Sequence, residues 1–300
     1  MKPIIFDTET TGTDHKTDQI IEAAWLELPE FPHQFAALQP VEFPHYHERF
    51  KPNVPISLGA QAVHHIICQD LVGCRESKEF ALPAGPLLMI GHNVDFDWRM
   101  AGENPDIKRI CTLALSRFLF PDKDSHTQSA MMYLIARRNG REAQARELLR
   151  NAHAALDDVR NCAIVLRFLL EVAMDAGHAA DTWEEVHALS EKARIPTVMP
   201  YGKHKGTPIN QVPNDYKAWL LRQPDVDPYL VQALRQPRHS TSAPHPGRFL
   251  FQQARTGRRP VGDSTMPRGP PKSGRAASSA CSRSTDVLLA GRVQTNDSGC

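Results

Sequence analysis

The chain lacks a cysteine framework and long apolar runs, and both absences restrict the kind of protein it can be. Its six cysteines form no Cys-x-x-Cys pair and no regular spacing, which favours reduced thiols in a cytosolic protein over a disulfide scaffold. No apolar run approaches the roughly 18 residues of a membrane-spanning helix. The N-terminus enters an apolar strand directly rather than a signal segment. We therefore expect a soluble, cytoplasmic protein.

A strong net charge is also absent. The 35 Lys and Arg residues against 34 Asp and Glu give +1, which neither indicates nor excludes nucleic acid as a partner. Residues 236–300 nevertheless hold ten Arg and Lys against three Asp. They are rich in Pro, Ser, Gly and Arg, so we expect a disordered basic tail. Such a tail can add non-specific affinity for nucleic acid, but its abrupt change in composition favours a segment without function.

What the chain does contain is acidic residues next to apolar segments. Residues 4–6 are typical of a buried strand and lead into Asp7 and Glu9, which point to the same face because side chains alternate along a strand. Two ionised carboxylates this near to each other repel, which costs free energy unless a cation lies between them. One interpretation is a divalent-metal site for phosphoryl-transfer chemistry, and the other is a pair of solvated turn residues.

Two further acidic segments follow. The apolar run at 87–90 ends at Gly-His-Asn, after which Asp95 and Asp97 lie at a helix start. His153 then stands five residues before Asp158, at the entrance to a long apolar helix. Each could be an ordinary acid that complements a helix dipole, but three such segments in this order indicate a shared site.

Together these segments resemble the DEDDh-type 3′→5′ exonucleases, which include proofreading exonucleases, ribonuclease T, oligoribonuclease and exodeoxyribonuclease X. The first motif, Asp-x-Glu-Thr-Thr-Gly, matches residues 7–12, and the second, His-Asn-x-x-Phe-Asp, matches 92–97. The last, His followed by Asp five residues on, matches His153 and Asp158. The family usually has a bulky apolar residue after the first motif, where this chain has Thr13.

The resemblance implies a catalytic site of four carboxylates and one histidine. These are Asp7, Glu9, Asp97, Asp158 and His153. The acids would bind two Mg²⁺ ions, or Mn²⁺ in their place, because carboxylates are hard oxygen donors and two ions can clamp the attacking and leaving oxygens. The histidine would take a proton from the attacking water. Asp95 and Asp157 are implied to be neighbours of the ligands.

The resemblance also implies contacts to the substrate. Thr10, His92 and Phe96 belong to the matched motifs. His64 lies in a segment at 55–66 that resembles one beside the terminal nucleotide in exodeoxyribonuclease X and proofreading subunits. An ordinary loop histidine is an equal alternative for His64.

Residues 196–235 differ in character from what precedes them. A Gly-Lys-x-x-Gly turn and a helix with Tyr216 and Trp219 resemble a small C-terminal module of exodeoxyribonuclease X that ribonuclease T and oligoribonuclease lack. Lys203 and Lys205 on this turn would contact phosphate. Tyr216 and Trp219 could stack on bases, but their helical spacing with leucines favours the module's core.

Apolar patterns predict a mixed α/β architecture. We expect strands at 3–8, 20–28, within 33–43, at 86–91 and at 107–111, and helices at 112–119, 127–138, 142–150 and 154–176. The resemblance makes this a ribonuclease-H-like mixed five-stranded sheet flanked by helices. The expected divisions are an exonuclease domain at 1–178, a helical linker at 179–195, the module at 196–235 and the tail at 236–300.

The sequence thus predicts a metal-dependent exonuclease that degrades DNA from 3′ ends, single-stranded or duplex, to nucleoside 5′-monophosphates. The C-terminal module favours exodeoxyribonuclease X within the family. Two alternatives stay open: a 3′→5′ exoribonuclease, since the motifs do not select the sugar, and a non-catalytic nucleic-acid-binding protein with a relic site. The presence of all five catalytic residue types argues against the relic.

Overall fold

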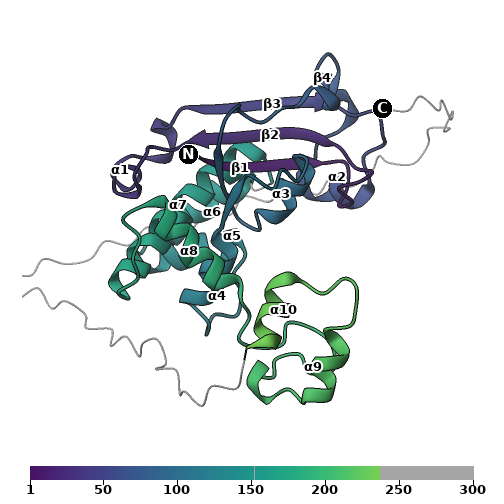
Figure 1. The fold of residues 1–300 in the computed structure, drawn as a ribbon. Helices are drawn as coiled ribbons and strands as arrows, with labels where there is room; N and C mark the ends of the chain where they lie inside the picture. Colours follow the sequence, from purple (N-terminus) through teal and green to yellow (C-terminus); the bar gives the residue numbers. More distant parts are fainter. Residues whose placement is uncertain (152, 237–300) are drawn as a thin grey trace, which may run out of the picture. The chain divides into compact units, whose positions relative to one another are not determined.

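A computed structural model describes residues 1–151 and 153–236 of the chain (Figure 1). The predicted tail beyond residue 236 lies outside the described residues. The described part has the expected α/β architecture, with a mixed sheet and helices α4 to α8 on one side of it (Figure 1). Among these residues, no helix combines the length and apolar character that crossing a membrane requires.

The sheet has six strands rather than the five expected, in the order β4-β3-β2-β1-β5-β6. Its members are β1 (Lys2–Thr10), β2 (Ile20–Glu27), β3 (His45–Lys51), β4 (Arg75–Glu76), β5 (Leu87–Gly91) and β6 (Lys108–Cys111). β1 pairs antiparallel with β2 and parallel with β5, and β2 pairs antiparallel with β3. β1 therefore lies inside the sheet, and its residues 4–6 are at most 1% exposed.

The prediction of a strand within residues 33–43 is wrong. That stretch forms α1 (Pro32–Ala37) and a 3₁₀ turn (Pro40–Glu42), each with proline in its first turn, where the fixed φ of proline suits a helix start. The third strand is instead β3, whose residues are mostly His, Glu, Arg and Lys. It has no apolar run, so its pairing with β2 is not visible in the local sequence.

The expected helices are present. They are α4 (Thr112–Leu119), α5 (Gln128–Arg138), α6 (Glu142–Leu148) and α7 (Ala155–Asp175). α7 packs on β1 and β2, and its stripe of Val159, Ala163, Leu166 and Leu170 is at most 4% exposed, as the periodicity predicts,. Two shorter helices, α2 (Leu58–His64) and α3 (Asp95–Met100), follow β3 and β5 in the chain.

The segment expected as a linker at 179–195 is helical but is part of the core. α8 (Trp183–Arg194) starts with a capping box between Thr182 and Glu185,. Its Trp183 and Val186 are buried in the same apolar cluster as α7. Ser190 Oγ accepts a hydrogen bond from the Cys111 main-chain N–H, 2.9 Å away. An amphipathic face thus packs α8 against α4 and β6.

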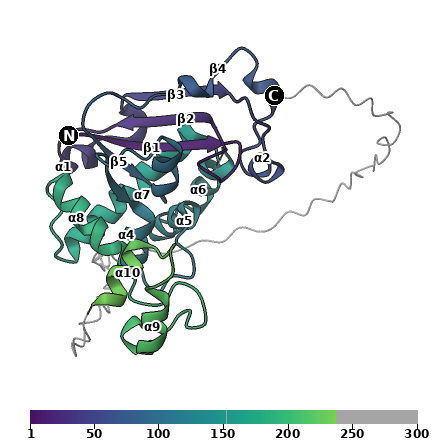
Figure 2. The same cartoon turned by 45° about the vertical axis from the view of Figure 1, so that its right-hand side comes forward.

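The C-terminal module has an apolar cluster of its own and contains α9 (Asn214–Leu220) and α10 (Pro228–Arg235) (Figure 2). Its buried residues include Met199, Ile209, Val212, Leu220 and Leu230. Tyr216 is half-buried against this cluster. The prediction that Trp219 belongs to the core is wrong, since Trp219 is 47% exposed.

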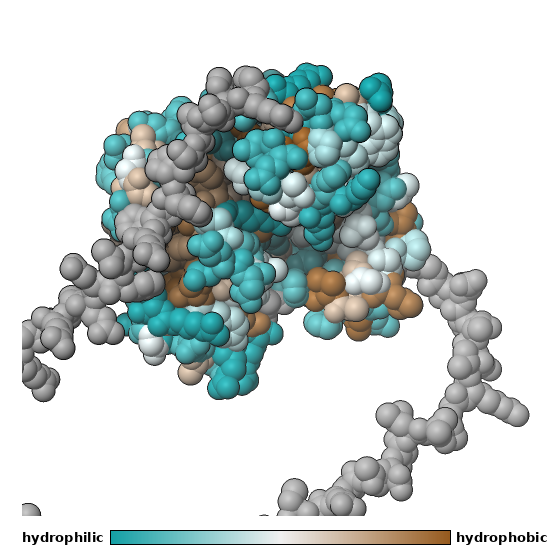
Figure 3. All heavy atoms as spheres, turned by 90° about the horizontal axis from the view of Figure 1, so that it is seen from below, coloured by the Kyte–Doolittle hydropathy of each residue, from teal (hydrophilic) through white to brown (hydrophobic). Residues whose placement is uncertain are grey.

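The face of the molecule in Figure 3 is largely hydrophilic, and its hydrophobic side chains lie in separate patches. Cys74, Cys111 and Cys162 are free thiols, as the absence of a regular cysteine pattern predicts.

Candidate catalytic site

Three acidic side chains from two distant segments converge at one point. Asp7 and Glu9 lie on β1, and Asp158 lies in the first turn of α7. A carboxylate oxygen of each lies within 4.8 Å of those of the other two. The alternation along β1 turns Asp7 and Glu9 to one face, and the packing of α7 on that strand brings Asp158 to them.

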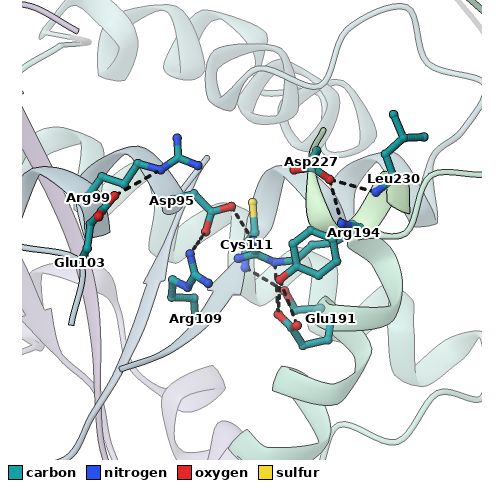
Figure 4. Close-up of polar contacts among 11 residues, drawn as sticks. Asp95, Arg99, Glu103, Arg109, Cys111, Glu191, Arg194, Asp227 and Leu230 are labelled. Atoms are coloured by element: carbon teal, nitrogen blue, oxygen red, sulfur yellow. Dashed lines mark hydrogen bonds and ion pairs between the residues drawn. The ribbon is translucent and has the colours of Figure 1, made fainter. Parts of the chain in front are cut away.

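Asp97, in the first turn of α3, faces the same strand. Its Oδ1 accepts hydrogen bonds from the main-chain N–H of Thr8 (3.0 Å) and from Thr8 Oγ1 (2.8 Å). Asp95 instead pairs with Arg109 (2.5 Å) and with Arg194 (2.6 Å) (Figure 4). Of the two candidate acids in the second motif, Asp97 is therefore the one beside Asp7.

Burial and mutual repulsion govern the electrostatics of these acids. Burial raises the pKa of Asp7, and the nearby carboxylates Asp97, Asp158 and Glu9 raise it further. Burial, with the charge of Asp158, raises the pKa of Glu9 to about 9. Burial also raises the pKa values of Asp97 and Asp158, against the hydrogen bonds each accepts. Ionising all of these acids at once is therefore unfavourable unless a cation compensates their negative charge.

That chemistry fits a divalent metal. Carboxylates in such a cluster are the oxygen ligands that Mg²⁺ and Mn²⁺ prefer. Within the described part of the chain, Asp7, Glu9 and Asp158 are placed to surround an ion, and Asp97 borders them.

His153 stands at the edge of this cluster. It adopts a left-handed backbone with φ of 71°, and its main-chain N–H donates to Asp158 Oδ2 at 2.8 Å. Asp158 Oδ1 accepts from Gln128 Nε2 at 3.0 Å. Unlike the acids, His153 is exposed, so its ring has access to water.

The expected substrate contacts lie in varied settings. Thr10 is 6% exposed, and its Oγ1 donates to the Gly12 carbonyl at 2.6 Å. His64 is 7% exposed, and its Nδ1 accepts the Ile66 N–H at 2.9 Å. A neutral His64 ring therefore carries its proton on Nε2. Phe96 is half-buried on α3.

His92, another of the expected substrate contacts, has its ring hydrogen-bonded within the fold. Its Nε2 lies 2.9 Å from the His126 carbonyl oxygen, and its Nδ1 lies 3.0 Å from Thr112 Oγ1. Because a carbonyl only accepts, Nε2 donates and Nδ1 accepts from the hydroxyl. Burial lowers the pKa of His92 to about 4. Both ring nitrogens are therefore occupied within the fold.

The sequence matches the Exonuclease protein family over residues 4–166, more than half of its length. The chain belongs to this family. Membership confirms the resemblance inferred from the three motifs. Residues 189–225 of the exonuclease also match a family described as a putative quorum-sensing-regulated virulence factor. No curated protein matches the chain significantly.

Solved structures similar to the exonuclease include two nucleases with bound DNA. Exonuclease X in complex with 5′ overhanging duplex DNA is 22% identical, with 62% of this chain and 99% of that chain covered and a TM-score of 0.43. E. coli Exonuclease I in complex with a dT13 oligonucleotide is 18% identical, with 58% and 42% covered and a TM-score of 0.42. The family assignment rests on the sequence match.

Three residues beside the exonuclease site were not expected from the sequence: Thr8, Gln128 and Glu22. Thr8 and Gln128 hold Asp97 and Asp158 through the hydrogen bonds described above. Thr8 was inside the first motif, where its contact to Asp97 could have been suspected. Gln128 carried no local signal.

Glu22 is the most deeply buried of these three. It is 1% exposed on β2, directly opposite Glu9 in the sheet register. Its Oε1 accepts from Arg49 Nε (2.7 Å) and contacts His47 Nε2 (3.1 Å), and its Oε2 accepts from the Ala155 N–H (3.0 Å). The charge in the middle of the apolar run of β2 was the signal that could have identified it.

Proposed function

We propose that this exonuclease removes nucleotides from the 3′ ends of DNA in a metal-dependent hydrolysis that releases nucleoside 5′-monophosphates. The convergence of Asp7, Glu9 and Asp158 within 4.8 Å is the observation that carries the proposal. Burial and repulsion make these acids a site that requires a cation, and phosphodiester hydrolysis is the chemistry that such metal sites serve.

Asp7, Glu9, Asp97 and Asp158 would hold two Mg²⁺ ions, with Mn²⁺ able to substitute. When bound, the ions stabilise the attacking and leaving oxygens of an in-line displacement. Thr8 fixes the carboxylate of Asp97 through two hydrogen bonds.

His153 acts as the general base and takes the proton of the attacking water. Its exposed ring can reach water, and imidazole is the side chain that most often serves as a general base. The hydrogen bond from its main-chain N–H to Asp158 Oδ2 keeps the residue beside the acids. The nearby carboxylate of Asp158 also stabilises the imidazolium that forms.

Thr10, Phe96 and His64 contact the terminal nucleotide in this proposal. The His64 ring accepts the Ile66 N–H at Nδ1, and its Nε2 is buried without a hydrogen-bond partner among the described residues, so contact with the nucleotide requires this side chain to move. Lys203 and Lys205, both exposed on the module's turn, contact phosphate. The module also favours DNA as the substrate, because it resembles that of exodeoxyribonuclease X.

The test uses 5′-labelled single-stranded DNA, duplex DNA and RNA, each with Mg²⁺ or with EDTA. We expect DNA to shorten from its 3′ end with Mg²⁺ only, and Asp7→Ala to abolish turnover while retaining binding. Asp122→Ala, a change of an exposed acid, is the matched control and should keep the parent rate. An active Asp7→Ala variant would contradict the metal-site assignment.

The same gel separates the two alternatives. Faster shortening of RNA than of DNA would identify an exoribonuclease. Binding without shortening of any substrate would identify a nucleic-acid-binding protein with a relic site.

A further inference from the structure

The C-terminal module contains a small cleft whose aromatic side chains have no part in the proposed function. Its volume is about 260 Å³, and it is lined by Lys203, His204, Pro213, Asp215, Tyr216 and Trp219. We propose that this cleft is a second nucleic-acid site, in which a base of single-stranded DNA stacks on Trp219 while Lys203 contacts the adjacent phosphate. The choice of DNA as the ligand rests on the proposed function.

The aromatic side chains of the cleft form a connected group. Trp219 is 47% exposed, and its ring centroid lies 5.4 Å from that of Tyr216. His204 also contacts the Tyr216 ring, edge-on, with centroids 4.6 Å apart. The next residue of α9, Leu220, is buried in the module's core, so the core is filled without the indole. An exposed tryptophan beside a second ring is a stacking platform for a base.

The turn that carries the lysines is built against this platform. Gly202 has φ of 77°, and a Cβ at that position would lie 2.7 Å from Tyr216 Oη. Only glycine allows the turn to approach Tyr216 this closely while adopting that backbone. Hydrogen bonds from Lys205 N to Gly202 O (3.1 Å) and from Gly206 N to Met199 O (2.8 Å) hold the turn in place.

The charges of the cleft select a nucleotide over a simple anion. Lys203 and Lys205 are exposed and form no ion pair within residues 1–151 and 153–236, which leaves them available for phosphate. Asp215 in the cleft would repel a free anion, but its carboxylate can accept a hydrogen bond from an N–H group of an unpaired base, such as N3–H of thymine. Single strands fit best, because their bases are free to leave the stack.

The module is also anchored to α8 near the catalytic helix α3. Arg194, whose side chain is 4% exposed, pairs with Asp95 of α3 and with Glu191 (Figure 4). Tyr229 of α10 donates its hydroxyl proton to Glu191 at 3.0 Å, and Arg194 lies 5.3 Å from the Tyr229 ring centroid. A strand bound in the cleft therefore stays attached to the enzyme while its end is shortened.

The test measures equilibrium binding of fluorescein-labelled dT20 to the full chain in EDTA, so that it does not depend on cleavage. Trp219→Ala should raise the Kd about 5- to 150-fold, the range expected for the loss of one base stack. Trp219→Phe, which retains a ring, should recover most of the affinity. Tyr201→Ala is the matched control, since Tyr201 is 43% exposed in the same module but does not line the cleft, and it should stay within twofold of the parent.

Two further readouts identify the mode of binding. Lys203→Ala should reduce the slope of log K against log salt by about 0.7, the value for one phosphate of a single strand. Trp219 is the exposed tryptophan of the four in the chain, so dT20 should quench intrinsic fluorescence in the parent and not in Trp219→Phe.

Unchanged affinity in Trp219→Ala, or an equal loss in Tyr201→Ala, would overturn the cleft as a binding site. Either result in a protein that still shortens DNA leaves the proposed function intact. A Trp219-dependent affinity in a protein that shortens nothing would support the cleft and reject the proposed function.

Discussion

Replacing Glu22 by glutamine should destabilise the protein by an amount that depends on pH. Hydrogen bonds from His47, Arg49 and the Ala155 N–H, with the charge of Arg49, outweigh burial and lower the pKa of Glu22 from 4.5 to about 2. A shift of that size corresponds to about 3 kcal/mol. Because the pKa is lowered in the folded state, this stability is present above pH 4.5 and is lost as the pH falls through about 2.

Glutamine has the shape of protonated glutamate, but only one of its two terminal atoms, the carbonyl oxygen, can accept a hydrogen bond. Its amide group would place a donor against the donors of either Ala155 or Arg49, which leaves a buried polar group unpaired. Glu22→Gln should therefore lower the free energy of unfolding by about 3 kcal/mol at pH 7, measured by urea denaturation in EDTA. The difference from the parent should shrink towards zero near pH 2.

Glu27→Gln is the matched control, because Glu27 lies on the same strand and pairs with Lys2 across 2.7 Å with both side chains about two-fifths exposed. Exposed pairs of this kind contribute about 0–1 kcal/mol. Glu22 also raises the pKa of Glu9, so its replacement relieves some repulsion between the acids, and this effect works against the expected loss. A difference below about 0.5 kcal/mol at pH 7, or one independent of pH, would refute this account of Glu22.

Two further predictions concern the catalytic site. His153→Ala should reduce the Mg²⁺-dependent rate by about 10²–10⁴-fold, the usual loss for a general base, in a single-turnover assay; an unchanged rate would assign the base elsewhere. Because burial and Asp158 raise the pKa of Glu9 to about 9, its contribution to stability is full below pH 4.5 and is lost as the pH rises through 9. The Tm in EDTA should therefore fall between pH 6 and pH 9, and the increase in Tm caused by Mg²⁺ should be larger at pH 9. Equal Mg²⁺ effects at both pH values, or the same profile in Glu9→Gln, would contradict the burial of an ionisable acid cluster.

The parts of the fold that the sequence predicted are those with strong local patterns. β1, β2, β5 and α7 each contain an apolar run or stripe that is buried as expected. β3 was missed because its polar residues acquire their role from pairing with β2. The helix α8 was expected, but its place in the core was not, since the surface that accepts Trp183 is formed by distant segments.

The same division applies to the candidate site. Motif spacing singled out Asp7, Glu9, Asp97, Asp158 and His153, and the structure brings three of the four acids together and places Asp97 against Thr8. The occupied ring nitrogens of His92 could not be predicted, because their partners lie 20 and 34 residues away.

The sequence by itself determined the strands and helices that contain their own apolar run or stripe, and the acidic residues that stand at their ends, because these properties depend on neighbours in the chain. Only the tertiary structure decided that Asp95 pairs with Arg109 and Arg194, that Glu22 ties β2 to the start of α7, and that Trp219 stays outside the core. The physical reason is that burial, hydrogen-bond partners and pKa shifts arise from distances between segments far apart in the sequence.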